Sequence, residues 1–249
     1  MRGRHPSPSV DEYWADQLGV TVERLGPPGV ALVHEGRGGF EGYSGVLFFR
    51  RGETLIVSAP PDLARSIEAS LSALSPDAVE DLQLLRSVVG IEPERVVGPV
   101  FQAFVTPGRF SPPSAAHPVR LEDARTVESH LRRACTEEEW EVSGLSGVRT
   151  PVAAVREGDM IVAAAGARER APRVVDPCVL THPGHRGRGL GREVVACVTA
   201  TALDQGDLVV YQTLRSNRGA VAIARGLGFV EYATGVAFRL APDRAEGSR

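Results

Sequence analysis

Residues 186–191 read Arg-Gly-Arg-Gly-Leu-Gly, and this stretch decides how the second half of the chain is interpreted. It follows an apolar, β-prone run at 174–181 and precedes a run at 190–203 whose apolar residues have helical spacing. Glycines at alternate positions leave backbone N–H groups accessible where a helix begins, and that end of a helix attracts anions. Strand, glycine turn and helix together predict a cradle for a pyrophosphate group.

The overall composition is that of a folded protein without a bias toward nucleic acid. The chain has 249 residues, 43% of them hydrophobic, and a formal net charge of −3 at pH 7. Nucleic-acid-binding surfaces are usually basic. No apolar run reaches the roughly 20 residues of a membrane span, and no apolar segment of a secretory signal follows the N-terminus. We therefore expect a cytoplasmic protein that binds neither membranes nor nucleic acid.

The three cysteines, Cys135, Cys178 and Cys197, are scattered along the chain. Their number is odd and no pair has the CxxC spacing of a metal or redox site. We expect three reduced thiols and no metal site.

A proline-rich segment at 106–114 predicts a boundary between two domains. Its sequence, Thr-Pro-Gly-Arg-Phe-Ser-Pro-Pro-Ser, cannot continue a helix or a central strand. We expect an N-terminal α/β domain over residues 1–110, a linker over 111–117 and a second domain over 118–249.

The first domain carries no recognisable chemical motif. Its pattern predicts strands at 45–50, 54–58 and 96–105, a helix that begins at Pro60, and a helix at 76–89 that ends at Gly90. Three roles stay open for it: a degenerate copy of the second domain, a wall of an acceptor pocket, or the interface of a homodimer.

The second domain is predicted to be a mixed sheet with helices packed on it, which is an α/β (α+β) fold. The element order is β-α-β-β-β-α-β-α-β. The strands are expected at 118–121, 152–156, 160–167, 173–181, 208–212 and 229–240, and the helices at 122–139, 190–203 and 217–225.

Residues 118–240 resemble the GCN5-related N-acetyltransferase (GNAT) family. The turn fits the family pattern Arg/Gln-x-x-Gly-x-Gly/Ala, residues 179–183 are similar to the strand end before it, and Asn217 with Leu227-Gly228-Phe229 is similar to a later motif. A P-loop and a dinucleotide fingerprint both fail, because no GxxxxGK run exists and Arg192 stands where the last fingerprint glycine should be. The resemblance implies a GNAT-like acyl-CoA N-acyltransferase fold with acetyl-CoA as the acyl donor.

The resemblance also implies which residues contact acetyl-CoA. The amides of the turn would hold the pyrophosphate, and the backbone of Val179 and Thr181 would pair with the pantetheine arm as an added strand does. For Asn217, an N-cap role for the next helix is the alternative. The complete set is Val179, Leu180, Thr181, Arg186, Gly187, Arg188, Gly189, Leu190, Gly191, Arg192 and Asn217.

The implied reaction is direct attack of a primary amine on the thioester. An ammonium group has a pKa of about 10, so it must first lose a proton, and a general base is expected. A backbone N–H near Val179 or Leu180 would stabilise the developing oxyanion.

Asp176 is the candidate base, because it lies on the strand that should line the cleft; an exposed charge at a strand kink before Pro177 is the alternative. His182 and His185 are further candidates for proton transfer, with contact to solvent or phosphate as their alternative. Many members of the family have a Tyr as the acid at the position of Ala224, and Tyr232 is the candidate replacement.

Trp140 and Glu141 are candidate contacts for the acceptor, because this region borders the acceptor pocket in the family. The alternative is a solvated acidic helix end with one packing Trp.

The predicted function is an acetyl-CoA-dependent N-acetyltransferase for a small-molecule amine. Two alternatives stay open: a catalytically weak acyl-CoA-binding regulatory module, suggested by Ala224, and a protein or peptide N-acetyltransferase.

Overall fold

A computed structural model of the chain describes residues 6–34, 45–148 and 151–240. The chain forms two compact units, each assembled from separate segments. Of the described residues, unit 1 contains 6–8, 103–148, 151–212 and 218–231, and unit 2 contains 9–34, 45–102, 213–217 and 232–240. The linear division into 1–110 and 118–249 stays a prediction.

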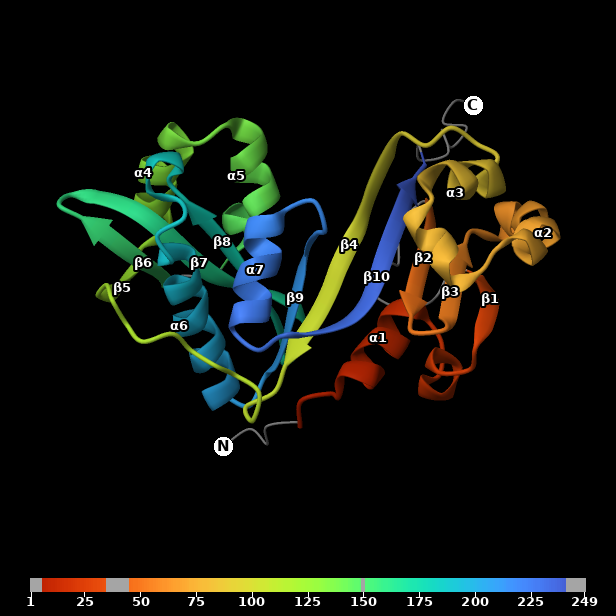
Figure 1. Ribbon diagram of the computed structural model, residues 1–249, viewed down its shortest axis with the longest axis horizontal. Coiled ribbons are helices and arrows are strands. Elements are labelled where there is room, and N and C mark those ends of the chain that lie inside the picture. The colour runs from red at the N-terminus through yellow and green to blue at the C-terminus, as the bar shows by residue number, and fades with distance from the viewer. Residues whose placement is uncertain (1–5, 35–44, 149–150, 241–249) are drawn as a thin grey trace, which may run out of the picture. The chain divides into compact units, whose positions relative to one another are not determined.

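The sheet of unit 1 follows the order β9-β8-β7-β6-β5 (Figure 1). Its strands are β5 (Val119–Glu122), β6 (Val152–Glu157), β7 (Met160–Ala171), β8 (Val174–Thr181) and β9 (Leu208–Leu214). The strands from β5 to β8 pair antiparallel, and β8 and β9 are parallel. This arrangement confirms the predicted mixed α/β sheet.

The helices of unit 1 bury their apolar faces against this sheet. They are α4 (Ala124–Ala134), α5 (Glu137–Ser143), α6 (Leu190–Asp204) and α7 (Arg218–Gly226), with short 3-10 turns at η4 (Leu145–Gly147) and η5 (Pro183–His185). One core cluster joins α4 and α5 to β6, β7 and β8 through Val127, Leu131, Trp140, Val152, Ala154, Ile161, Ala164, Cys178 and Leu180.

The prediction of one helix over 122–139 is wrong, because the chain turns at residues 135 and 136. Cys135 has extended backbone angles of φ −110° and ψ 165°, so α4 ends there. The Thr136 side chain accepts a hydrogen bond from the Glu139 N–H, and the Glu139 side chain accepts one from the Thr136 N–H. This capping box begins a second helix.

Unit 2 contains a sheet with the order β1-β3-β2-β10-β4 (Figure 1). Its strands are β1 (Gly29–His34), β2 (Gly45–Arg51), β3 (Thr54–Ala59), β4 (Arg95–Val105) and β10 (Val230–Arg239). β10 pairs antiparallel with β2, from Thr234 opposite Arg50 to Arg239 opposite Gly45. Most of the last strand predicted for the second domain, from residue 232 onward, therefore belongs to unit 2.

The helices of unit 2 are α1 (Val10–Leu18), α2 (Pro61–Ser70) and α3 (Leu82–Val89), with 3-10 turns at η1 (Val22–Leu25), η2 (Leu71–Ala73) and η3 (Pro76–Glu80). The sequence pattern gave no prediction for α1, which begins with a capping box of Ser9 and Glu12. The predicted helix 76–89 is interrupted at Asp81, whose carboxylate caps α3 by accepting from the N–H groups of Gln83 and Leu84.

The cap at Thr136 gives a test of the break between α4 and α5. Thr136→Ala removes the acceptor of the Glu139 N–H, so we expect the free energy of unfolding to fall by about 1 kcal/mol. Ser129→Ala is the control, because this exposed hydroxyl only donates to a carbonyl of its own helix and its loss should cost under about 0.5 kcal/mol. Urea unfolding followed by circular dichroism measures both. Equal changes in the two variants would contradict the role of the cap.

Candidate functional site

The glycine turn before α6 follows a backbone path that side chains disfavour. Gly187 and Gly189 have φ values of +78° and +83°, in the left-handed region. A Cβ atom built on either residue meets no other atom within 4 Å. The glycines are therefore required for the course of the chain, and the space beside them is open.

The turn presents a row of backbone N–H groups without acceptors. Within the described residues, the N–H groups of residues 187–191 donate to no carbonyl or side chain, whereas the N–H groups of Arg192 and Glu193 both donate to the Gly189 carbonyl. These groups stand at the N-terminus of α6, a helix of 15 residues whose dipole adds positive potential at this end. The arrangement suits a bound anion, as the sequence predicts.

Gly191 lets the start of α6 approach β8 closely. A Cβ atom on Gly191 would lie 3.1 Å from Ile223 Cδ1 and 3.1 Å from Thr181 Oγ1. The row of N–H groups consequently stands directly beside the end of β8.

The backbone of β8 has a free edge next to this turn. The His182 N–H donates to the Val162 carbonyl of β7 at 2.9 Å. Because backbone groups of a strand point alternately to either side, those of Leu180 face β7, and those of Val179 and Thr181 face away from it. Leu180 is therefore committed to the sheet, whereas Val179 and Thr181 face the side on which β9 lies.

The pairing of β8 with β9 ends early. The register comprises Val174 opposite Leu208 and Val175 opposite Val209, and no pair follows between residues 176–178 and 210–212, all of which the structure describes. The Thr181 carbonyl instead accepts a hydrogen bond from Arg186 Nε at 3.2 Å.

Each arginine of the turn has a partner in the protein. Arg186 Nη2 lies 2.7 Å from Glu139 Oε1 of α5, and Arg192 Nη2 donates to the Gly226 carbonyl at 2.6 Å. Arg188 Nη2 lies 2.5 Å from Glu157 Oε1. The groups of the turn that remain available to an anion are therefore its backbone N–H groups, and the arginines join the turn to other elements.

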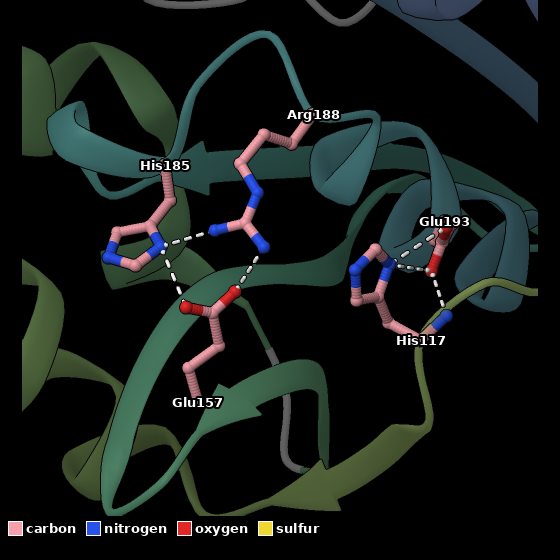
Figure 2. Close-up of polar contacts among 5 residues, drawn as sticks. All are labelled: His117, Glu157, His185, Arg188 and Glu193. Atoms are coloured by element: carbon pink, nitrogen blue, oxygen red, sulfur yellow. Dashed lines mark hydrogen bonds and ion pairs between the residues drawn. The ribbon is translucent and has the colours of Figure 1, made fainter.

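Glu157 connects the turn to the end of β6, as Figure 2 shows. One of its oxygens faces Arg188, and the other lies 3.2 Å from His185 Nδ1. The hydrogen bond with Arg188 lowers the pKa of the Glu157 carboxyl below its usual value, so it is ionised at neutral pH. His185 also lies 2.9 Å from Arg188 Nη1. His185 therefore belongs to a cluster that braces the turn.

A second contact in Figure 2 holds the segment before β5 against α6. Glu193, only 8% exposed, accepts from the His117 N–H at 3.1 Å and lies 3.2 Å from His117 Nδ1. This pair was not predicted, because His117 lies in the predicted linker and no local sequence pattern relates it to Glu193.

Asp176 lies on β8 and is 2% exposed, so its interpretation as an exposed charge is wrong. Its Oδ2 accepts from Arg170 Nε at 2.9 Å and also from Arg170 Nη2. Its Oδ1 faces the Gln212 N–H at 3.4 Å. Burial raises the pKa of Asp176, and the charge of Arg170 opposes that rise. The role of Asp176 as a base stays a prediction, with both oxygens already engaged.

Two other predicted residues belong to unit 2. The Tyr232 hydroxyl donates to Asp11 Oδ1 at 2.9 Å, and Arg51 lies 4.7 Å above the Tyr232 ring. Burial raises the pKa of Tyr232, so the phenol stays protonated. The Asn217 N–H donates to the Leu214 carbonyl at 2.9 Å. The acid role of Tyr232 and the cofactor role of Asn217 stay predictions.

Trp140 and Glu141 have different surroundings on α5. Trp140 is 4% exposed and packs into the core of unit 1, as the alternative interpretation expects. Glu141 is exposed. Ala224 on α7 is fully buried and supplies no acidic group.

The described residues contain neither a candidate metal site nor a candidate membrane span. No group of three or more His, Cys, Asp or Glu side chains in these ranges could hold a metal ion. None of the helices there has both the length and the apolar character needed to cross a membrane.

Comparison with known proteins gives one family match. Residues 118–229 match the model of the acetyltransferase (GNAT) family. No curated protein matches the chain at a significant level.

Several solved structures are similar to part of the chain. A putative GNAT acetyltransferase from Novosphingobium aromaticivorans is 21% identical, with 59% of this chain and 65% of that chain covered and a TM-score of 0.45. A GCN5-related N-acetyltransferase from Kribbella flavida is 22% identical, with 65% of each chain covered and a TM-score of 0.46. The chain thus spans 65% of the length of each of these two structures, less than two thirds. A putative acetyltransferase from Salmonella typhimurium, solved with its cofactor acetyl-CoA, is 19% identical, with 53% of this chain and 100% of that chain covered and a TM-score of 0.37.

The rates at which the cysteines are alkylated test the burial of β8, which carries Cys178. Burial raises the pKa of Cys178 to about 12, and it also raises the pKa values of the half-buried Cys135 and Cys197. Because the thiolate is the reactive form, we expect iodoacetamide at pH 8 to modify Cys178 last, and only when the protein unfolds. Mass spectrometry of timed samples measures the order. Labelling of Cys178 in the folded protein as fast as that of Cys197 would contradict it.

Proposed function

We propose, from the match of residues 118–229 to the model of the acetyltransferase (GNAT) family, that this chain transfers the acetyl group of acetyl-CoA to the primary amine of a small molecule. One observation carries the proposal. The unpaired N–H groups of residues 187–191 lie next to the free backbone edge of β8. A donor that contains both a pyrophosphate and an amide-bearing arm matches these two features together.

The pyrophosphate of acetyl-CoA would be held by the N–H groups of the turn. The open space beside Gly187 and Gly189 and the close approach at Gly191 support this assignment. A helix N-terminus with free N–H groups favours phosphate groups in general. Arg192 would add long-range attraction, because it donates to a neutral carbonyl, whereas Arg186 and Arg188 are paired with Glu139 and Glu157.

The pantetheine arm would lie along β8. The backbone groups of Val179 and Thr181 face the free edge and would pair with the amides of the arm, as an added strand pairs with a sheet. Arg186 would have to release the Thr181 carbonyl for this pairing. Of the two predicted oxyanion donors, the Val179 N–H is the one that faces this edge, because that of Leu180 faces β7.

Acetyl-CoA would supply the acetyl group as a thioester. The acceptor amine must reach it unprotonated. Because Asp176 is paired with Arg170, we propose that the amine gives its proton to water. The leaving thiolate, with a pKa near 8.5, can take a proton from solvent.

The acceptor would be a cationic amine that approaches from the acidic side of α5. Glu138 and Glu141 are exposed there, and Glu139 joins the same helix to the turn through Arg186. Exposed carboxylates raise the local concentration of a cation and act less at high salt.

Gly189→Ala tests the donor site. A side chain at a positive φ costs about 1–2 kcal/mol, and relaxation of this strain would move the N–H groups, so we expect acetyl-CoA to bind about tenfold more weakly or worse. Gly52→Ala is the matched control, because Gly52 also has a positive φ, of +56°, with nothing within 4 Å of its Cβ position, and it lies in the β2–β3 hairpin. Isothermal titration calorimetry measures the affinity. A change in both variants, or in neither, would contradict the assignment.

A thiol reporter for released CoA, used with a panel of small amines and peptides, tests the reaction. Release with small amines supports the proposal. Binding of acetyl-CoA without release over the whole panel would favour a regulatory binding module, and release with peptides alone would favour a peptide acetyltransferase. Absence of acetyl-CoA binding would refute the proposal.

A further inference from the structure

The parting of β8 and β9 coincides with the dipeptide Asp176-Pro177. Leu208 N–H donates to the Arg173 carbonyl, and the pairs at Val174 and Val175 follow. Because backbone groups alternate in direction, the residue after Val175 that faces β9 is Pro177. A proline has no N–H to donate. The backbone ladder between the two strands therefore cannot continue normally at this point.

The side chain of Asp176 occupies the place where the ladder stops. The register of the two strands ends at Val175 opposite Val209, and its continuation would place Asp176 opposite Val210. Its Oδ1 instead faces the N–H of Gln212, two residues further along β9, in a long contact of 3.4 Å. The Asp176 carboxylate thus takes the place of a β8 backbone carbonyl, which would accept from the Gln212 N–H if the ladder between the strands continued.

Arg170 holds the carboxylate in this position. The register between β7 and β8 shifts between Glu169 and Ala171, so Arg170 is the extra residue of a β-bulge. Bulges commonly redirect a side chain. Here both Arg170 Nε and Nη2 donate to Asp176 Oδ2.

The ion pair between Asp176 and Arg170 contributes little net stability for a pair buried between β7, β8 and β9. Asp176 is almost fully buried, and the desolvation of a buried carboxylate offsets much of the attraction to its partner. A well-packed apolar pair is often as stable as a buried ion pair. The contacts of Asp176 with β9 point to a geometric role instead.

We propose that Asp176, held by Arg170, is a positioning residue that keeps β9 away from β8 and so keeps the Val179 and Thr181 edge open for the acyl-CoA arm. This inference rests on the proposed function. Without the carboxylate, β9 would close toward β8, and the two strands would pair over the segment that the arm needs. The affinity for acetyl-CoA would fall although the fold is kept.

Asp176→Asn is the central variant, because it keeps the side-chain volume and loses the charge that Arg170 holds. We expect the Kd for acetyl-CoA to rise about tenfold or more. Asp207→Asn is the matched control, since Asp207 Oδ1 also pairs with an arginine, Arg173 Nε, at 2.7 Å, where the strands are still joined. We expect the control to change thermal stability at most and to leave the Kd within about twofold.

The variants also separate positioning from base catalysis. If Asp176 is a positioning residue, Asp176→Asn raises the Kd for acetyl-CoA. Its kcat at saturating acetyl-CoA falls by a smaller factor than its affinity does. The acidic limb of the pH profile of kcat stays as in the wild type. An unchanged Kd would overturn the proposal. An unchanged Kd with kcat abolished would also restore Asp176 as the base.

Amide hydrogen exchange of Asp176→Ala gives a readout that needs no ligand. Closure of the strands predicts slower exchange at the Val179 and Thr181 amides than in the wild type. If acetyl-CoA does not bind the wild type, the proposed function fails, and this exchange result still decides the positioning role. Equal exchange at both amides would overturn it.

Two more variants cover the remaining outcomes. If the single variants fail to fold, Asp176→Leu combined with Arg170→Met removes both charges together and should fold with the same loss of affinity. Pro177→Ala restores the missing N–H. An affinity loss from Pro177→Ala, with none from Asp176→Asn, would assign the parting of the strands to proline and overturn the role of Asp176.

Discussion

The contact between the start of α6 and the end of β8 is the constraint on which the candidate site depends. Gly191 has no side chain, and a single added carbon would already crowd Ile223 and Thr181. The contact places free N–H groups and a free strand edge side by side. The N–H groups of the turn alone would also suit a simple phosphate. Only together with the strand edge do they favour a ligand that has both a pyrophosphate and an amide-bearing arm.

The three arginines of the turn suggest direct binding of an anion by their side chains, but each of them contacts another part of the protein. Arg186 and Arg188 are neutralised by Glu139 and Glu157, and Arg192 binds a carbonyl. Exposed pairs of this kind add little to stability. Their effect is to fix the direction of the turn, since each contact joins it to a different element: α5, the end of β6 and the end of α7. The positive potential of the turn is thus supplied by its backbone N–H groups at the start of α6.

The local parts of the site could be predicted from the sequence, because glycine spacing, helical periodicity and strand patterns all act over a few residues. The break between α4 and α5 was also encoded locally, in Thr136 and Glu139, but the apolar periodicity runs through it and hid it. The burial of Asp176 could not be predicted. It depends on Arg170, whose direction is set by a bulge in a neighbouring strand, and on a strand that lies beyond α6 in the sequence.

The pairing of β10 with β2 could not be predicted from local patterns either. Alternation of apolar and polar residues indicates a strand, but it does not show which strand is its partner. It has a consequence for biosynthesis. As the chain leaves the ribosome, β2 is made early and its outer edge stays open until residues 234–239 emerge. An open strand edge pairs readily with other chains, and such distant pairing is slow to form. Until those last residues are made, this edge of β2 lacks its partner strand and is open to association with other chains.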